Sequence, residues 1–260
     1  YHNHVIYEKS DQLGGTWRDN TYPGISCDVP AHGYTYSFEP NPDWSQTFAP
    51  GPEIKEYFER VADKYDVRKN IRFNESVNYC AFEDGRWTIR TTAGREERAD
   101  IVIAATGVLH IPYTAPINGL ERFQGSSFHS SRWDHSVDLV GKKVGVIGTG
   151  STAIQITSAI AHKVEKFSLF QRTAQWVMPI ENEMYSAEDK VNFKDSENLD
   201  AVVNQIHQDF DNFSNGVIDS ESAMMAELEA ECLRNVEGHV HDPVLREKLR
   251  PDYRAEIGSA

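Results

Sequence analysis

Hydrophobic and polar positions along this chain follow more than one period. Behind Pro52, apolar side chains recur at helical spacing as far as residue 65, and proline is favoured at the first position of a helix, so we expect a helix there. Residues 71–92 alternate with period two around Asp84-Gly85, which predicts two or three strands with a tight turn. The continuous apolar run 101–105 predicts a buried parallel strand.

A glycine-rich stretch combines a strand, a turn and a helix. Residues 144–147 are mostly β-branched, Gly148 and Gly150 follow, and apolar side chains then take helical spacing to residue 160. A helix that begins there directs unpaired N–H groups and a partial positive charge at the turn, which suits a pyrophosphate. The pattern G-x-G-x-x-A is one variant of the dinucleotide-binding fingerprint. A tight strand–helix turn without any ligand is the alternative.

The next strand, 164–170, ends just before Arg172 and Thr173. In an NAD site, an acidic residue at this strand end, about 20 residues after the glycines, binds the ribose 2′-hydroxyl. A guanidinium and a hydroxyl fit a 2′-phosphate instead. We therefore expect NADP(H) as the cofactor of this turn, and a solvated arginine at a strand end is the alternative.

The composition changes after Pro179. Residues 181–242 contain sixteen acidic residues and three Lys or Arg residues. Residues 201–213 and 220–236 have helical apolar spacing, and Asp242-Pro243 is typical of a helix start. This pattern predicts a helical subdomain with an acidic, solvated outer face.

Composition and charge narrow the classes of function. The chain has 260 residues, 39% of them hydrophobic, enough for one large domain or two small ones. A net charge of −14 argues against nucleic acid and against an anionic membrane as partners, and no apolar run reaches membrane-spanning length. The three cysteines lie far apart without metal-ligand spacing, so we expect free thiols, no metal site and a reducing, cytoplasmic location.

The first residues resemble the end of a nucleotide-binding strand. Residues 3–7 are predicted to form a short strand, followed by Glu8. In a dinucleotide fold an acid at the end of the second strand binds a ribose, and the glycine loop lies about 20 residues upstream. We therefore expect the chain to begin inside a first nucleotide-binding unit, unless Glu8 is a surface residue after a first strand. Trp17, after paired glycines, has a flat face that suits either a flavin ring or a core.

Two long gapped motifs carry a family resemblance. They are Gly14-Gly15-x-Trp17-x-x-x-x-Tyr22-Pro23-Gly24-x-x-x-Asp28 and Phe123-x-Gly125-x-x-x-His129-x-x-x-Trp133-Asp134. Both match motifs of the type I Baeyer–Villiger monooxygenases. Residues 104–107 also resemble the segment that links the FAD and NADP domains in the wider class of flavin-containing monooxygenases. The resemblance covers about residues 1–180.

The resemblance implies an α/β fold with two dinucleotide-binding, Rossmann-like domains and a helical insertion. Its parts would be a partial FAD-binding domain (1–110), a linker with the family fingerprint (111–140), an NADP-binding Rossmann unit (141–182) and a truncated helical subdomain (183–260). The family's FAD glycine loop and active-site Arg have no counterpart in this sequence. We therefore expect a middle fragment that has little activity alone.

The resemblance also implies site residues. Asp28 is the expected catalytic residue, because it would orient the family's active-site Arg beside the flavin. His129, in the linker, either shapes domain movement or is a buried structural histidine. The expected cofactor-binding residues are Glu8 for the FAD ribose; Gly15, Thr16, Trp17 and Tyr34 for the flavin; Val77 for the adenine; Cys27 and Asp28 for the nicotinamide side; Gly148, Thr149, Gly150, Ser151, Thr152, Ala153 and Gln155 for the NADP pyrophosphate; and Arg172 with Thr173 for the 2′-phosphate.

The implied reaction is an FAD- and NADPH-dependent monooxygenation. One oxygen atom of O2 would be inserted next to a ketone carbonyl through a C4a-peroxyflavin, giving an ester or lactone. An N- or S-hydroxylating flavin monooxygenase is the alternative enzyme, and a non-catalytic NADP-binding module is the alternative from another class. The expected partners are a small ketone or heteroatom substrate and O2, without nucleic acid or membrane; the oligomeric state is not predicted.

Overall fold

The computed structural model describes residues 3–218 and 222–255. The chain forms two compact units, each assembled from two separate stretches. Unit 1 comprises Tyr1–Thr21 and Gly51–Asp134, and unit 2 comprises Tyr22–Pro50 and His135–Ala260. Within the described ranges, no helix combines the length and the apolar character that crossing a membrane requires.

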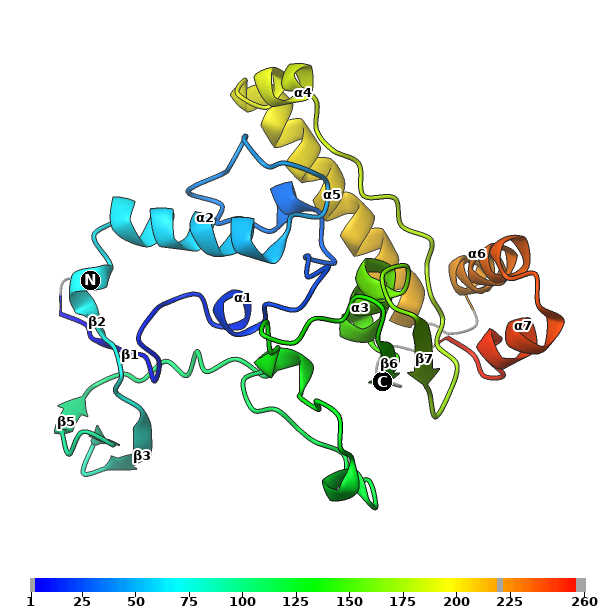
Figure 1. Ribbon diagram of the computed structural model, residues 1–260. Coiled ribbons are helices and arrows are strands. Elements are labelled where there is room, and N and C mark those ends of the chain that lie inside the picture. The colour runs from blue at the N-terminus through cyan, green and yellow to red at the C-terminus, as the bar shows by residue number, and fades with distance from the viewer. Residues whose placement is uncertain (1–2, 219–221, 256–260) are drawn as a thin grey trace. The chain divides into compact units, whose positions relative to one another are not determined.

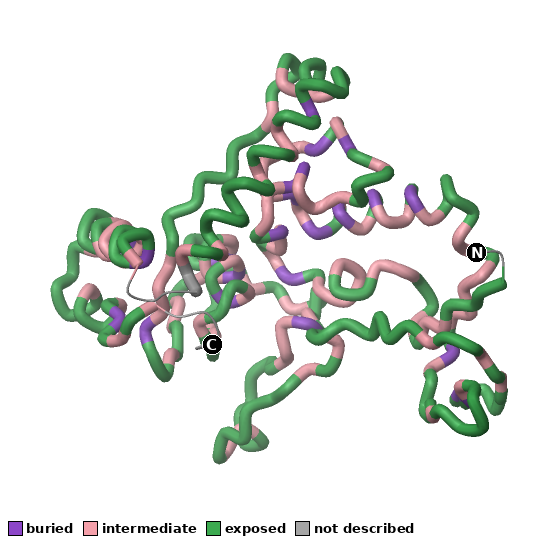
Figure 2. The backbone as a smooth tube through the Cα atoms, turned by 180° about the vertical axis from the view of Figure 1, so that it is seen from behind, coloured by how far each residue is buried: buried purple, intermediate pink, exposed green. Residues whose placement is uncertain are grey.

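Unit 1 contains a short parallel strand pair and an amphipathic helix. Strand β1 (Ile6–Tyr7) pairs with β2 (Ile71–Arg72), and the short helix α1 (Thr16–Asp19) and the longer α2 (Gly51–Lys64) lie between them in the sequence. Helix α2 buries Ile54, Tyr57 and Val61, which recur at helical spacing along one face (Figure 2). The predicted helix behind Pro52 is confirmed.

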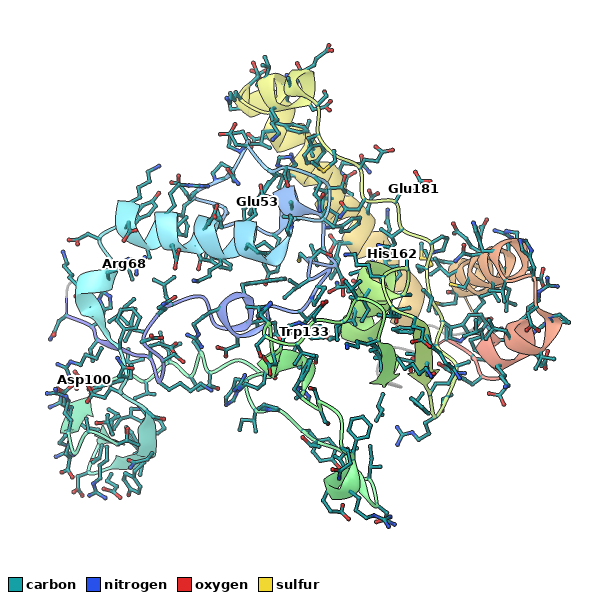
Figure 3. The ribbon with its side chains drawn as sticks, viewed as in Figure 1. Glu53, Arg68, Asp100, Trp133, His162 and Glu181 are labelled. Carbon is teal, nitrogen blue, oxygen red and sulfur yellow. The ribbon has the colours of Figure 1, made fainter. Side chains whose placement is uncertain are left out.

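A three-stranded antiparallel sheet completes the regular structure of unit 1. Its strands β3 (Val77–Glu83), β4 (Arg86–Thr91) and β5 (Glu96–Ala99) lie in that order. Asp84 and Gly85 both have positive φ, 51° and 76°, as a two-residue hairpin turn requires, so the predicted Asp-Gly turn is confirmed. Asp100, labelled in Figure 3, follows β5 and pairs with Arg86 at 2.8 Å.

Charged side chains join the strand pair to this sheet. Glu97 of β5 accepts hydrogen bonds from the Tyr7 hydroxyl and from Arg72 Nη1, both at 2.6 Å, and these bonds lower the pKa of Glu97. The side chain of Glu75, 8% exposed, accepts from Thr91 at 2.8 Å and Arg95 at 2.9 Å, which lowers its pKa as well. These bonds fix the strand whose end carries Glu8.

The strand predicted at residues 101–105 is wrong. No strand is assigned there, and the side chains of Ile101 and Ile103 are 76% and 85% exposed. An apolar run favours burial, but a strand also needs a neighbour that accepts and donates its backbone hydrogen bonds. None of the described strands pairs with this run.

Unit 2 contains a β-α-β crossover. Strands β6 (Lys143–Ile147) and β7 (Lys166–Phe170) pair in parallel from Lys143↔Lys166 to Ile147↔Phe170, and helix α3 (Ser151–Ile160) connects them. Figure 1 shows α3 beside the two strands, and its buried face consists of Ala153, Ile156 and Ile160. The α/β class is thus confirmed, whereas two complete Rossmann-like domains stay a prediction.

The acidic part of unit 2 is helical, as predicted. Helices α4 (Ala187–Asn192), α5 (Ser196–Ile218), α6 (Ala223–His239) and α7 (Pro243–Leu249) follow one another (Figure 1). The side chain of Asp242 accepts from two amides at the start of α7, which confirms the predicted helix start. Helix α5 is longer than the predicted 201–213, and the predicted start of the next helix at Ser220 lies outside the described residues.

Both units contain short 3-10 helices. In unit 1 they are η2 (Arg68–Asn70), η3 (Leu120–Arg122) and η4 (Ser130–Arg132), and in unit 2 there is η1 (Ala31–Gly33). Turn η4 lies within the predicted linker and is followed by Trp133, which is labelled in Figure 3. The Trp133 ring packs edge-on against Phe128, with centroids 5.1 Å apart.

Candidate functional site

The glycine turn between β6 and α3 is open to solvent. Gly148 has φ of 116°, a conformation that favours glycine, and a Cβ at Gly148 or Gly150 would meet no atom within 4 Å. Both glycines and Ser151 are exposed. Among the described contacts, none engages the amides of Ser151 and Thr152, so these first-turn N–H groups are available to an anion.

Thr149 and Ala153 are less exposed than the glycines of this turn. Thr149 is half-buried, and Ala153 is 7% exposed, with its amide donating to the Gly150 carbonyl at 2.9 Å. A small side chain at this third position lets the helix pack closely on the strands. Ala153 therefore contributes to the packing of α3 and is not exposed to a ligand through its side chain.

The end of β7 lies beside this turn. The amide of Gly148 donates to the carbonyl oxygen of Phe170 at 2.9 Å, and Ile147 is the register partner of Phe170. Arg172 and Thr173 follow two and three residues later, and both are exposed. The structure therefore brings the segment of the predicted 2′-phosphate residues to the edge where the glycines turn.

Gln155, one turn into α3, was predicted at the NADP pyrophosphate, and its side chain contacts the loop that contains Tyr22, Ser26 and Asp28. Its Oε1 accepts from the Tyr22 hydroxyl at 2.9 Å, and its Nε2 donates to the Ser26 carbonyl at 3.1 Å and to Asp28 Oδ1 at 2.8 Å. We call these four residues the Gln155 network. Burial raises the pKa of the Tyr22 phenol, which keeps it a hydrogen-bond donor.

Gly24 permits the contact between this loop and α3. Its φ is +86°, and a Cβ there would lie 2.6 Å from the backbone oxygen of Gln155 and 3.0 Å from the Ala159 Cβ. Any side chain would push the loop away from the helix. The Tyr22-Pro23-Gly24 portion of the motif is thus explained by packing against α3.

The other predicted residues on this loop have distinct environments. Asp28 is exposed, whereas Cys27 is 5% exposed and its amide donates to the Ala49 carbonyl at 3.0 Å. Burial raises the pKa of the Cys27 thiol, so it behaves as a small buried apolar group. Tyr34, which caps the end of η1, is half-buried.

In unit 1 the predicted FAD residues gather at the end of β1. Glu8 Oε1 accepts from the Ser10 amide at 2.8 Å and from Arg18 Nη1 at 3.2 Å. Arg18 is the third residue of α1, so it ties Glu8 to the helix that contains Thr16 and Trp17. Within the described residues, Glu8 Oε2 has no hydrogen-bond partner.

The loop before α1 depends on its paired glycines. Gly14 has φ of 116° and Gly15 has φ of 49°, both in the region that glycine favours. Gly15 and Thr16 are exposed and Trp17 is half-buried, so one surface of this short helix is accessible.

Val77 is the first residue of β3. It pairs with Thr91 across the antiparallel sheet and is 42% exposed. The amide of Glu75, two residues before Val77, donates to the Glu8 carbonyl at 3.0 Å, so the segment that leads into β3 lies against Glu8. The role of Val77 at the adenine stays a prediction.

His129 has a local structural role. Its Nδ1 accepts from the Ser131 amide at 3.1 Å and lies 2.9 Å from the Ser131 hydroxyl, which caps η4. The half-buried ring therefore fixes the turn that presents Trp133. This geometry favours the structural alternative, and a part in domain movement stays a prediction.

Sequence reasoning missed three residues that organise these sites. They are Arg18, which holds Glu8, and Tyr22 and Gly24, which hold the Asp28 loop on α3. Tyr22 and Gly24 are fixed positions of the motif quoted above, so the signal was present. Arg18 occupies a variable position of that motif, and only the fold reveals its contact.

Comparison with known proteins identifies the class of this chain. The family model "Flavin-binding monooxygenase-like" matches residues 2–194. The chain belongs to this flavin-binding monooxygenase-like family.

Individual relatives agree with this assignment. The chain is 45% identical over 249 residues to an uncharacterised monooxygenase of Mycobacterium bovis, covering 95% of this chain and 50% of that protein. It is 40% identical to a Baeyer–Villiger monooxygenase of Streptomyces coelicolor, covering 96% of this chain and 48% of that protein. The chain thus spans about half the length of these curated relatives.

A solved structure resembles the fold as well. Cyclohexanone monooxygenase from Rhodococcus sp. Phi1 bound to NADP+ superposes with a TM-score of 0.81 at 28% identity, covering 96% of this chain and 55% of that one. The predicted resemblance to Baeyer–Villiger monooxygenases is confirmed by these comparisons.

Proposed function

We propose that this chain supplies the NADP(H)-binding turn and part of the FAD site of a monooxygenase that inserts one oxygen atom of O2 next to a ketone carbonyl. One observation carries the proposal. The open glycine turn of unit 2 is hydrogen-bonded, through Gly148 and Phe170, to the strand end that leads directly into Arg172. The names of the relatives, among them Baeyer–Villiger monooxygenases, support the ketone as the substrate class.

The residues present fit a phosphorylated nicotinamide dinucleotide. The first-turn amides of α3 face an open turn without side chains at Gly148 and Gly150, which leaves room for a pyrophosphate. Arg172 and Thr173 provide a planar cation and a hydroxyl for the 2′-phosphate. We therefore assign Gly148 to Ala153 to the pyrophosphate and Arg172 with Thr173 to the 2′-phosphate.

The end of β1 fits a ribose. Glu8 Oε1 is occupied by Ser10 and Arg18, and Oε2 can accept hydrogen bonds from a diol. Close to it in the chain, Gly15 and Thr16 expose backbone, and Trp17 offers an apolar face suited to a flavin ring. We assign these residues to FAD, together with Tyr34 and Val77, and we assign Cys27 with Asp28 to the nicotinamide side, on the grounds of the family resemblance alone.

The chemistry divides between cofactors and protein. When bound, NADPH supplies a hydride and FAD supplies the activated oxygen. Arg172 selects the phosphorylated carrier, the α3 amides fix its pyrophosphate, and Asp28 holds a cationic side chain beside the flavin. That cation would be the family's active-site Arg, which stabilises negative charge on the reacting oxygen.

The experiment that tests the proposal compares NADPH with NADH. Calorimetric titration of the chain carrying Arg172→Ala should show NADPH affinity falling at least roughly tenfold, because a charged hydrogen bond contributes about 1.5–3 kcal/mol. NADH affinity should change much less, since NADH lacks the 2′-phosphate. Lys163→Ala, which removes an exposed cation at the other end of α3, is the control. Equal losses for both nucleotides would remove the 2′-phosphate role.

A second measurement separates the enzyme from the two alternatives. Anaerobic addition of NADPH to the FAD-loaded protein should bleach the flavin absorbance if the chain is part of an enzyme. NADP binding without retention of FAD would favour a non-catalytic module. With a chain extended to the full length of its relatives, ester formation from a cyclic ketone supports the proposal, and oxidation of amines or thioethers alone would favour a heteroatom hydroxylase.

A further inference from the structure

The side chain of Gln155 is saturated by protein contacts. A primary amide offers two N–H donors and one oxygen with two lone pairs. Nε2 donates to Ser26 and Asp28 at 3.1 and 2.8 Å, and Oε1 accepts from Tyr22 at 2.9 Å with a longer approach of 3.5 Å from the Ser26 amide. No donor remains for a phosphate, so this side chain does not bind the pyrophosphate directly.

The orientation of the amide follows from its surroundings. Two acceptors, the Ser26 carbonyl and the Asp28 carboxylate, face one end of the side chain, and a phenol whose pKa is raised by burial faces the other. Reversing the amide would place its oxygen against both acceptors. Only one arrangement satisfies all four residues of the Gln155 network.

The loop that carries Asp28 is held from two sides. On one side, Gly24 lies directly against the α3 backbone, where a Cβ would come within 2.6 Å of the Gln155 oxygen. On the other side, Ser26 bridges to Pro50 and the Cys27 amide donates to Ala49 at 3.0 Å. The exposed Asp28 carboxylate receives its one described protein hydrogen bond from Gln155.

Gln155 also lies close to the ligand end of its helix. It is four residues after Ser151, the first residue of α3, and the same helix begins at the glycine turn. Any ordering or shift of the first turn of α3 by a bound dinucleotide is therefore transmitted to Gln155 through the rigid helix backbone, and from its side chain to Asp28.

We propose that Gln155 is a positioning residue that couples occupancy of the glycine turn by NADP(H) to the placement of the Asp28 carboxylate. The inference rests on the proposed function, and it deepens that function by naming how one site regulates the other. The side chain acts through Asp28 and touches neither cofactor. Binding of the nicotinamide dinucleotide thus prepares the carboxylate that holds the cation beside the flavin.

The test follows amide hydrogen exchange of residues 22–28 in the chain, with and without saturating NADP+. In the wild-type chain, NADP+ should slow exchange at Ser26 to Asp28 by about tenfold, since a ligand at about 100 times its Kd stabilises the elements it orders by up to about 100-fold. Gln155→Glu keeps the shape of the side chain but removes both donors and places a negative charge against Asp28. In this variant NADP+ should still protect the first turn of α3 but no longer residues 26–28.

Measuring NADP+ affinity beside hydrogen exchange shows whether Gln155→Glu breaks the coupling to Asp28 or disrupts the NADP site itself. The new carboxylate lies one turn from the amides proposed to hold the pyrophosphate, so NADP+ affinity of Gln155→Glu should fall by less than about tenfold, and protection is compared at saturating NADP+ in both proteins. Ser158→Ala is the matched control on the same helix, because within the described part of the chain its hydroxyl donates only to the Ile154 carbonyl, at 3.1 Å. Its NADP+-induced protection of residues 26–28 should equal that of the wild type. If Gln155→Glu does not fold, Tyr22→Phe, which removes one hydroxyl from the Gln155 network, should reduce this protection at least threefold.

The outcomes distinguish the inference from the proposed function. NADP+ binding without protection of residues 26–28 in the wild type, or with undiminished protection in the variant, overturns the coupling and leaves the NADP site intact. Failure of the wild-type chain to bind NADP+ at all overturns the proposed function and the coupling together.

Discussion

The two candidate carboxylates of this chain are held in opposite ways. In unit 1, Glu8 accepts from the Arg18 guanidinium at 3.2 Å, and the Arg18 side chain is only 11% exposed. In unit 2, Asp28 accepts from the neutral amide of Gln155 at 2.8 Å and is itself exposed. A guanidinium neutralises the charge of the carboxylate that it binds, whereas an amide orients a carboxylate and leaves its charge uncompensated.

This difference matches the proposed roles. A ribose diol needs an acceptor oxygen in a fixed position, and Glu8 Oε2 provides one while Oε1 holds Arg18 and Ser10. A carboxylate that must hold a cation is best oriented by a neutral neighbour, and Asp28 is oriented by the amide of Gln155. Under the proposed roles, the charge of the neighbour that orients each carboxylate would distinguish the acid that binds a hydroxyl from the acid that binds a cation.

The largest expected effect compares the glycines beside the two carboxylates. Gly24→Ala should lower the free energy of unfolding by roughly 3 kcal/mol, because its φ is +86° and the new Cβ would lie 2.6 Å from the Gln155 oxygen. Gly15→Ala should cost only about 1 kcal/mol, since Gly15 has φ of +49° but no atom within 4 Å of a Cβ. Urea unfolding of both variants measures the difference, and equal losses would show that the approach of α3 does not matter.

Local elements of this fold could be predicted from the sequence, whereas contacts between distant segments could not. The β-α-β unit around residues 144–170 and the hairpin at Asp84-Gly85 were predicted because their signals are local: a period, a turn and a helix start within a few residues. The place of Gln155 was not predicted, because Tyr22 and Asp28 lie 133 and 127 residues away in the chain. Only the fold reveals such a contact.

The wrong strand and the missed helix have different causes. Residues 101–105 have the composition of a buried strand, but composition does not show whether a neighbouring strand is there to pair with it. Helix α4 is only six residues long, and its reciprocal cap between Ser186 and Asp189 uses an aspartate where Glu or Gln is usual. The candidate site residues were predicted from motif positions, strand ends and the family resemblance, and none of these signals marks Arg18.

The second expected effect concerns the charged partner of Glu8. Arg18→Met should destabilise unit 1 by about 2 kcal/mol, because it leaves the partly buried Glu8 and Asp19 without their cation while keeping most of the apolar contacts of the side chain. Arg68→Met is the control, since Arg68 pairs with Asp63 at an exposed position and should cost less than about 1 kcal/mol. Thermal unfolding at neutral pH measures both. If both variants lose the same stability, Arg18 is no more than a surface charge.

The smallest expected effect tests the comparison directly, by neutralising each carboxylate with its isosteric amide. Glu8→Gln should cost about 1 kcal/mol, because Arg18 loses the charge that it pairs with. Asp28→Asn should change the free energy of unfolding by less than about 0.5 kcal/mol, since the amide oxygen of the new side chain still accepts from Gln155 and the site is exposed. Urea unfolding at pH 7 resolves the two. A larger loss for Asp28→Asn would mean that the Asp28 charge is already paired within the chain, and the distinction between the two acids would fail.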